Sequence, residues 1–284
     1  MIPRQASPAA PFAKRGINGD DKMLIQRQTA KERLRLFMKR LTFLITSGPT
    51  REYLDPVRYI SNESSGKMGA ALCEAALKIG HKVIFVSGKA AYYPKGKAEI
   101  INVVSADDMF KAVKKNFKRA NIIIGAAAVS DFKPANFSKS KIKKENILTL
   151  KLKQNPDILA YCGKNKKNQA VAGFALETDD LIKNAAKKLK DKNLDLIIAN
   201  GGESLGSDKT SVFFISKNRV LCKNTADGGR HCPPLDESKT ASLKPSSAFV
   251  VVAFKETGKK IVAGKIINET ISIFANIKAG KNFA

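Results

Sequence analysis

Residues 41–86 read LTFLITSGPTREYLDPVRYISNESSGKMGAALCEAALKIGHKVIFV. This stretch begins with an apolar run at 41–46 and ends with another at 82–86, and both have the length and composition of buried strands. Between them, residues 66–79 carry apolar side chains at helical spacing, and Gly80 is placed to end that helix. A strand, a helix and a second strand in this order are typical of a parallel sheet.

The same alternation continues along the rest of the chain. Continuous apolar strands between helices predict a parallel sheet covered on both faces. Further strands are expected at 100–104, 121–127, 170–175, 194–199 and 211–215, and further helices at 106–118, 156–161, 179–190 and 259–276. In such sheets ligands bind beyond the carboxyl ends of the strands, at a switch point. We therefore expect the site in the loops after Thr46, Val86, Ala127, Ala175 and Ala199.

One segment within the domain interrupts this rhythm. Residues 132–154 have little helical pattern, and their middle is basic, with Lys139, Lys141, Lys143 and Lys144. A β-like stretch at 146–152 follows. This composition predicts a mobile basic flap that ends in a strand.

The domain boundaries follow from composition. Residues 1–37 contain Pro3, Pro8 and Pro11 among small residues and have no strand pattern, so we expect an extension that is disordered or partly helical. A single domain is expected at 38–284. Within it, residues 222–248 combine glycines and prolines with polar residues, which predicts a disordered insertion.

The net charge is high, with 51 Lys and Arg against 25 Asp and Glu, a net +26. The excess occurs in every part of the chain, and Trp is absent, whereas a dedicated nucleic-acid binder usually gathers basic and aromatic residues on one surface. A generally lysine-rich surface is the plainest interpretation, and an anionic small substrate or a nucleic acid stays open as a partner.

The sequence gives no sign of a membrane or secreted protein. Its apolar runs, such as 249–254, are far shorter than the ~20 residues that a membrane span needs. No apolar signal-peptide core is present, and the four cysteines do not form a disulfide framework. We expect a cytoplasmic protein.

Neither of the two common phosphate-binding motifs is present. The first strand is followed by Gly48-Pro49-Thr50 instead of G-x-G-x-x-G, and Gly66-Lys67 lacks both the first glycine and the hydroxyl residue of a P-loop. Residues 61–66 still offer hydroxyls and backbone N–H groups at a helix start, where an anion is favoured. The alternative is that Ser64 or Ser65 only caps the helix.

Several ordered motifs resemble one known family. They are 48–52 (GPTRE), 55–62 (DPVRYISN), 64–69 (SSGKMG), 126–131 (AAAVSD), 141–144 (KIKK), 155–159 (NPDIL), 173–178 (GFALET) and 192–195 (KNLD). Together they resemble phosphopantothenate–cysteine ligase, over about residues 41–221 and weakly again from residue 259. The resemblance implies a Rossmann-like α/β fold with a mainly parallel sheet, helices on both faces and a basic flap.

The resemblance also implies an activity in coenzyme A biosynthesis. The family joins L-cysteine to 4′-phosphopantothenate through an acyl-nucleotide intermediate, and bacterial members similar to this chain use CTP with a divalent cation, Mg²⁺. It further implies a homodimer with the flap near the shared surface. Because about 40 residues cannot contain the flavin-binding decarboxylase domain of many bacterial relatives, we expect a separate decarboxylase to act next.

Site residues carried over from the family fall into two groups. Asn62 would orient the phosphopantothenate carboxyl or its acyl-nucleotide, and Lys141 would neutralise the triphosphate during transfer. Nucleotide contacts are implied for Gly125, Ala126, Ala127, Asp131, Lys141, Pro156, Asp157, Ile158, Leu159, Phe174, Lys188 and Lys192. For Phe174, Lys188 and Lys192, a core aromatic and a solvated lysine face are the stronger interpretations of the residues alone.

Some features stay outside this pattern. Cys222, His231 and Cys232 in the insertion are too few and too irregularly spaced to predict a zinc site, so the metal ligands are not assigned. Cys73 and Cys162 lie in helical patterns and are expected to be small buried hydrophobes. The competing functions are a basic nucleic-acid-binding module and an NAD(P)-dependent reductase, the latter opposed by the missing glycine motif.

Overall fold

The computed structural model describes residues 39–144, 147–176, 179–201, 209–217 and 250–280. The expected N-terminal extension at 1–37 and the expected insertion at 222–248 lie outside the described residues.

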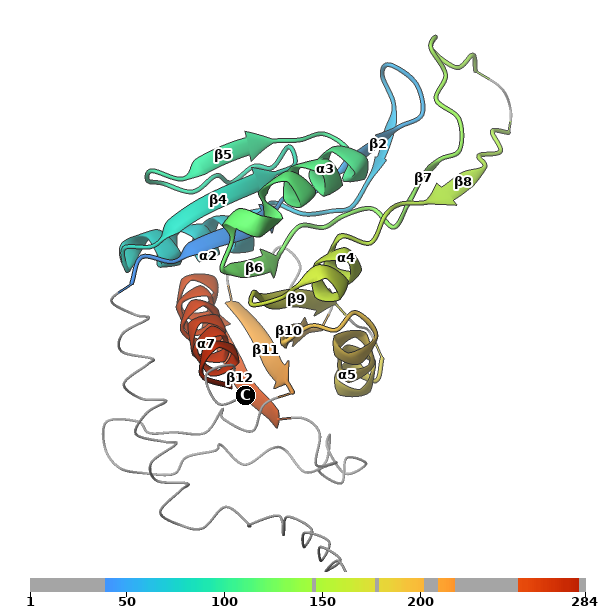
Figure 1. Cartoon of the computed structure of the whole chain (residues 1–284). Helices are drawn as coiled ribbons and strands as arrows, with labels where there is room; N and C mark the ends of the chain where they lie inside the picture. Colours follow the sequence, from blue (N-terminus) through green and yellow to red (C-terminus); the bar gives the residue numbers. More distant parts are fainter. Residues whose placement is uncertain (1–38, 145–146, 177–178, 202–208, 218–249, 281–284) are drawn as a thin grey trace, which may run out of the picture.

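The main sheet has eight strands among the described residues. They are β1 (Thr42–Ser47), β4 (Lys82–Ser87), β5 (Glu99–Asn102), β6 (Ile122–Gly125), β9 (Ala170–Leu176), β10 (Leu196–Asn200), β11 (Lys209–Ser216) and β12 (Val250–Gly258). Their order across the sheet is β12-β11-β10-β9-β6-β1-β4-β5 (Figure 1). The six strands from β5 to β10 are parallel, whereas β11 runs antiparallel to both of its neighbours. The predicted Rossmann-like, mainly parallel sheet is confirmed.

Helices cover both faces of this sheet, as predicted. α2 (Lys67–Lys78) and α7 (Lys259–Gly280) pack together on one face, over a core that includes Phe43, Phe85 and Phe274. α3 (Ala106–Asn116), α4 (Ile158–Asn165) and α5 (Leu181–Asp191) lie on the other face, over Leu44, Ile123 and Ile197. β1 lies between the two cores, because its successive side chains alternate between the faces.

Local signals in the sequence explain where several helices begin and end. Ser105 and Asp108 form a capping box at the start of α3. Gly80 has φ of +87° and donates its N–H to the carbonyl of Leu77, so it ends α2 as predicted. The short 3-10 helix η1 (Phe117–Arg119) continues α3.

Two small antiparallel pairs lie outside the main sheet. β2 (Arg51–Tyr53) pairs with β3 (Tyr59–Ser61), and β7 (Phe132–Pro134) pairs with β8 (Leu152–Gln154). Both project together from the sheet at the side where β1 and β6 end (Figure 1). No strand was predicted between residues 47 and 65, whereas residues 51–61 fold back on themselves as a hairpin.

Other boundaries also differ from the prediction. The flap strand begins at Leu152 instead of residue 146, and α4 spans Ile158–Asn165 instead of 156–161 because Asp157 caps it. β12 was not predicted as a strand at all. Its partner β11 precedes the 222–248 segment, so the sequence pattern alone did not pair them. None of the helices among the described residues is both long and apolar enough to cross a bilayer.

The close approach of α4 to the end of α5 gives a first prediction. A Cβ on Gly163 would lie 1.9 Å from the backbone oxygen of Lys192, so Gly163→Ala forces backbone apart. We expect a loss of about 1–3 kcal/mol in the free energy of unfolding, seen as a melting temperature several degrees lower in thermal circular dichroism.

The matched control is Gly264→Ala in helix α7. A Cβ at Gly264 meets nothing within 4 Å, so the change adds helix propensity and should leave the melting temperature equal or higher. Equal melting temperatures for the two variants would contradict the predicted clash.

Candidate functional site

The winding of the sheet reverses between β1 and β6. From β1 the chain continues into α2 on one face, whereas from β6 it continues through β7 and β8 to α4 on the opposite face. The segments that leave the carboxyl ends of these neighbouring strands therefore diverge, and in open α/β sheets a ligand crevice lies at this point. We take residues 47–66 and 125–131 as the walls of the candidate site.

Hydrogen bonds from backbone and side-chain groups join these two walls. The Ala128 N–H donates to the carbonyl of Gly48 at 3.0 Å, and the Ser130 N–H donates to Oγ1 of the buried Thr50 at 3.0 Å. Asn62, exposed at the end of the β2–β3 hairpin, donates from Nδ2 to the carbonyl of Val129 at 3.1 Å. Its amide oxygen has no hydrogen-bond partner among the described residues, which leaves an acceptor at the predicted position.

The start of α2 has no side-chain cap at its N-cap position. Gly66 is the N-cap, in the left-handed region with φ of +77°, and no side chain caps it. Ser65 only accepts a long 3.4 Å bond from the Lys67 N–H. The carbonyl of Gly66 accepts a bond from the Ser47 hydroxyl at 3.2 Å, which joins the helix start to the end of β1. First-turn N–H groups without a side-chain cap can serve an anion.

The glycines at the carboxyl end of β6 and in β9 have a packing reason. A Cβ at Gly125 would lie 2.7 Å from Leu159 Cδ2, and one at Gly173 would lie 2.7 Å from Leu159 Cδ1. Gly125 is among the residues for which the family resemblance implies a nucleotide contact. In the structure, the side chain of Leu159 from α4 occupies the space next to Gly125, and the implied nucleotide contact stays a prediction. Ala126 and Ala127 follow, half-buried, with the Ala126 N–H bound to the Thr46 carbonyl.

Two of the predicted nucleotide residues form an ion pair. Asp157 caps α4 by accepting from the Ala160 N–H at 2.9 Å, and its other oxygen lies 2.8 Å from Lys192 Nζ. Lys192 comes directly after the last residue of α5. The ion pair therefore links the start of α4 to the end of α5 on one face of the sheet. Pro156 precedes the cap and is half-buried.

Several other predicted site residues lie away from the Asp157–Lys192 pair. Ile158 is buried in the core beneath α4, and the half-buried Phe174 packs against the core on the α2 and α7 face. Lys188 and Asp131 are exposed, Lys188 on α5 and Asp131 just before β7.

Lys141 lies exposed in the flap. The next residue, Ile142, is hydrogen-bonded to Asp55 and Arg58, which belong to the family motifs but were not among the predicted site residues. Asp55, with no exposed surface, accepts the Ile142 N–H on Oδ2 at 3.1 Å. Arg58 donates from Nη2 to the Ile142 carbonyl at 2.9 Å, and its Nη1 lies 3.6 Å from Asp55 Oδ2. The Asp-Pro turn was the available signal, because Asp favours turns by accepting backbone N–H groups.

The charge of Asp55 is stabilised by these contacts. Burial raises the pKa of the carboxyl, but the N–H groups of Val57, Ile142 and Arg58, with the Arg58 guanidinium, outweigh it and lower the pKa below 3.8. The stability that Asp55 contributes is thus present above its ordinary pKa and is lost as the pH falls through the lowered value.

No thiol or metal cluster competes for the role of reactive centre in the described part of the chain. Cys73 and Cys162 are buried, and burial raises the pKa of each thiol to about 12, so both stay protonated and pack as small hydrophobes, as predicted. No group of three His, Cys, Asp or Glu side chains among the described residues could hold a metal ion. Cys222, His231 and Cys232 lie outside the described residues.

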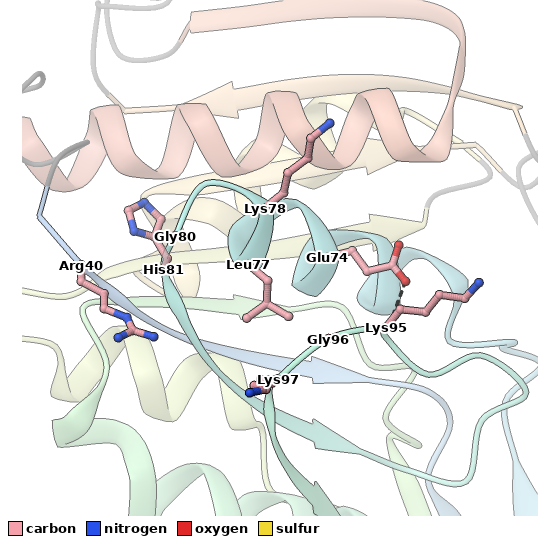
Figure 2. Close-up of a pocket in the computed structure, with 9 residues that line it drawn as sticks. All are labelled: Arg40, Glu74, Leu77, Lys78, Gly80, His81, Lys95, Gly96 and Lys97. Atoms are coloured by element: carbon pink, nitrogen blue, oxygen red, sulfur yellow. Dashed lines mark hydrogen bonds between the residues drawn. The ribbon is translucent and has the colours of Figure 1, made fainter.

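A basic hollow of about 540 Å³ lies at the opposite, amino edge of the sheet (Figure 2). Arg40, Lys78, Lys95 and Lys97 surround it, with Glu74 as its only acid. Arg40 precedes β1 and Lys78 ends α2, so the full length of both elements separates this hollow from the crevice. It therefore forms no part of the candidate site.

The chain matches known proteins over this domain. Residues 38–227 match the family described as the DNA/pantothenate metabolism flavoprotein C-terminal domain. The coenzyme A biosynthesis bifunctional protein CoaBC of Bacillus subtilis (strain 168) is 47% identical over 181 residues, 62% of this chain and 45% of that protein. The protein of the same name from Borreliella burgdorferi is 41% identical over 209 residues, 72% of this chain and 51% of that protein.

A solved structure agrees. The C-terminal domain of a CoaBC protein aligns with a TM-score of 0.62 and 31% identity, covering 81% of this chain and 94% of that domain. This chain thus spans about half the length of the curated relatives that it matches and nearly all of the solved C-terminal domain.

The left-handed glycine at the start of α2 gives a second prediction. In Gly66→Ala, the added Cβ would meet the Ala90 Cβ at 2.7 Å in a backbone conformation that already costs an L-residue about 1–2 kcal/mol. We expect urea unfolding to show a stability loss greater than that strain alone. Gly80→Ala measures the strain by itself, because Gly80 has a similar φ and nothing within 4 Å. Equal losses in both variants would show that the contact with Ala90 is not rigid.

Proposed function

Because the chain belongs to the DNA/pantothenate metabolism flavoprotein C-terminal domain family, we propose that it joins L-cysteine to 4′-phosphopantothenate in coenzyme A biosynthesis. The reaction has two steps. A carboxylate oxygen of phosphopantothenate attacks the α-phosphorus of a nucleoside triphosphate and pyrophosphate leaves. The cysteine amine then attacks the acyl carbon, loses a proton and displaces the nucleoside monophosphate.

One observation carries this proposal. The family match covers the whole switch-point crevice, and in that crevice Asn62 lies hydrogen-bonded to the wall after β6 while Lys141 lies on a segment fastened to the same hairpin. Both residues come from the motifs on which the family resemblance depends. Their joint attachment to one hairpin supports a shared role.

The charges around the crevice suit the first step. Phosphopantothenate and a triphosphate are both strongly anionic, so their approach is repulsive until cations and N–H donors offset the charge. The uncapped start of α2 offers backbone N–H groups, and the flap carries the exposed Lys139, Lys141 and Lys143. We assign Lys141 to the transferred phosphate, where its charge would lower the barrier to attack.

Asn62 is assigned to the acyl group in both steps. Its Nδ2 is occupied by the Val129 carbonyl, so its side chain is held in one orientation. The free amide oxygen could accept the N–H of the attacking cysteine amine or of the pantothenoyl chain. No protein nucleophile is required, because the amine is supplied by the substrate.

The nucleotide is assigned to the side of the crevice between β6 and α4. Gly125, Ala126 and Ala127 would border it, with Asp131 as a partner for a ribose hydroxyl or a phosphate-bound Mg²⁺. A Mg²⁺ that arrives on the triphosphate and keeps most of its waters needs few protein ligands. CTP is the nucleotide that the family resemblance favours, and a separate decarboxylase acting next remains a prediction, as does a cytoplasmic location.

The direct test of the function is pyrophosphate release. Purified protein is mixed with phosphopantothenate, Mg²⁺ and CTP, ATP, GTP or UTP in turn, with and without cysteine. We expect a burst of one pyrophosphate per site without cysteine and continuous turnover with it, fastest with CTP. Release that does not depend on phosphopantothenate would contradict the ligase assignment. Tight binding of an oligonucleotide that weakens steeply with salt would favour the nucleic-acid alternative.

Removing the charge of Lys141 gives a third prediction. Lys141→Gln keeps the length and hydrogen bonding of the side chain, so single-turnover pyrophosphate release without cysteine should slow by about 10²–10³-fold. Lys143→Gln, two residues along the same exposed segment, is the control and should cost much less. Formation of the intermediate at the wild-type rate in Lys141→Gln would remove Lys141 from the mechanism.

A second copy of this chain is the partner that we propose for the flap surface. The flap and its base expose large apolar side chains, with Phe132 53%, Phe137 56% and Ile147 80% exposed, and Leu148, Leu150 and Leu152 also exposed. Large exposed apolar side chains that are concentrated in one segment favour an interaction surface there. The flap is also where the family resemblance locates the surface shared by a homodimer.

The fourth prediction tests this dimer. In sedimentation velocity, the wild-type chain of 30.9 kDa should have twice its own mass, and Phe137→Glu should shift it to the monomer because a charge would be buried in the interface. Ile261→Glu, which alters an equally exposed apolar residue on α7, should leave the mass doubled. A doubled mass in Phe137→Glu would exclude the flap as the interface.

A further inference from the structure

The described residues of the flap, 135–144 and 147–151, are joined to the rest of the described chain by three hydrogen bonds. The Ser138 N–H donates to the Leu54 carbonyl at 2.8 Å, the Ile142 N–H donates to Asp55 Oδ2 at 3.1 Å, and Arg58 Nη2 donates to the Ile142 carbonyl at 2.9 Å. All three end on residues 54–58, the turn of the β2–β3 hairpin. The flap is therefore fastened at one place, and that place lies on the other wall of the crevice.

Asp55 is the centre of this attachment. Its Oδ1 accepts the N–H groups of Val57 and Arg58 at 2.9 and 2.8 Å, and its Oδ2 accepts from Ile142 and faces the Arg58 guanidinium. Every neighbouring group is a donor, so only a group with two acceptor oxygens satisfies them all. An amide in its place would turn an NH₂ toward at least one N–H, and in a fully buried position that mismatch has no water to relieve it.

The same carboxylate is connected to both residues assigned to the chemistry. Ile142 follows Lys141 directly, so binding its N–H and its carbonyl fixes the backbone from which Lys141 extends. The turn at Asp55 leads through β3 to Asn62, which is bound to the wall after β6. The positions of Lys141 and Asn62 thus both depend on one buried carboxylate, although the two residues are far apart in sequence.

We infer that Asp55 and Arg58 form a latch that fixes the flap, and with it the backbone of Lys141, against the turn of the β2–β3 hairpin. The consequence for catalysis rests on the proposed function, whereas the latch itself does not. Asp55 touches neither substrate nor reacting atoms in this arrangement, so it is a positioning residue. Loss of the latch should leave the fold intact and should lower the fraction of time in which Lys141 is in place.

The test is Asp55→Asn, studied in the full chain by two measurements. The first is amide hydrogen exchange, in which the Ile142 and Ser138 amides should exchange at least tenfold faster, while core amides such as Ile45 and Ile124 keep their protection. The second is single-turnover pyrophosphate release without cysteine, which should slow by about 10- to 100-fold. The matched control is Glu99→Gln, which removes another carboxylate bound to an arginine, at the far edge of the sheet, and should change neither.

The outcomes separate the latch from a structural role and from the proposed function. Faster exchange at Ile142 and Ser138 with unchanged core protection supports the latch, and unchanged exchange there overturns it. Faster exchange throughout the core also overturns it, because Asp55 would then only stabilise the fold. If Asp55→Asn shows faster flap exchange but releases pyrophosphate at the wild-type rate, then Asp55 does not position Lys141 for the reaction.

Two further arms keep the test decisive. If the wild-type chain releases no pyrophosphate with any nucleotide, the proposed function fails and the exchange measurement still decides the latch. If Asp55→Asn does not fold, Ile142→Pro removes the same hydrogen bond from the flap side, with the Ser138 amide as the reporter. Unchanged protection of Ser138 in that variant would overturn the latch.

Discussion

The position of β1 in the middle of the sheet is the constraint on which the other parts depend. It pairs along its whole length with β4 on one side and from Phe43 to Thr46 with β6 on the other, and its side chains reach both hydrophobic cores. Because the chain leaves these neighbouring strands toward opposite faces, a crevice opens at their carboxyl ends. The β2–β3 hairpin follows β1 and the flap follows β6 at this edge. The positions of Asn62 and Lys141 therefore depend on the pairing of β1 with β6.

The strands and helices of the sheet could be predicted because each one has a complete local signal. β1, β4, β9 and β10 are continuous apolar runs, and Ser105 and Gly80 mark helix ends by well-understood chemistry. The pairs β2–β3 and β7–β8 have only three residues in each strand, too few to establish an alternation. The placement of β12 next to β11 is a contact across a long segment, which periodicity cannot detect.

In the candidate site too, residues in local motifs could be predicted, whereas contacts between distant parts of the chain could not. Ordered motifs led to Asn62 and Lys141, and the structure fastens the segments that carry them to one hairpin. Asp55 lies 87 residues from its partner Ile142, so neither its burial nor its role could be recognised from spacing. Gly125 has a role that spacing could not reveal, because the side chain of Leu159, 34 residues away, packs where its Cβ would be.

The antiparallel pairing of β11 with β12 has a consequence for engineering this domain. Ser216 and Val250 are paired across the two strands, and Ser216 also lies opposite Leu196, the first residue of β10. The chain thus leaves and re-enters the sheet at neighbouring points on its amino edge, away from the crevice. The entropy of closing such a connection grows only with the logarithm of its length. A fluorescent domain or an affinity tag could therefore be inserted between these strands without altering the geometry in which substrates are handled.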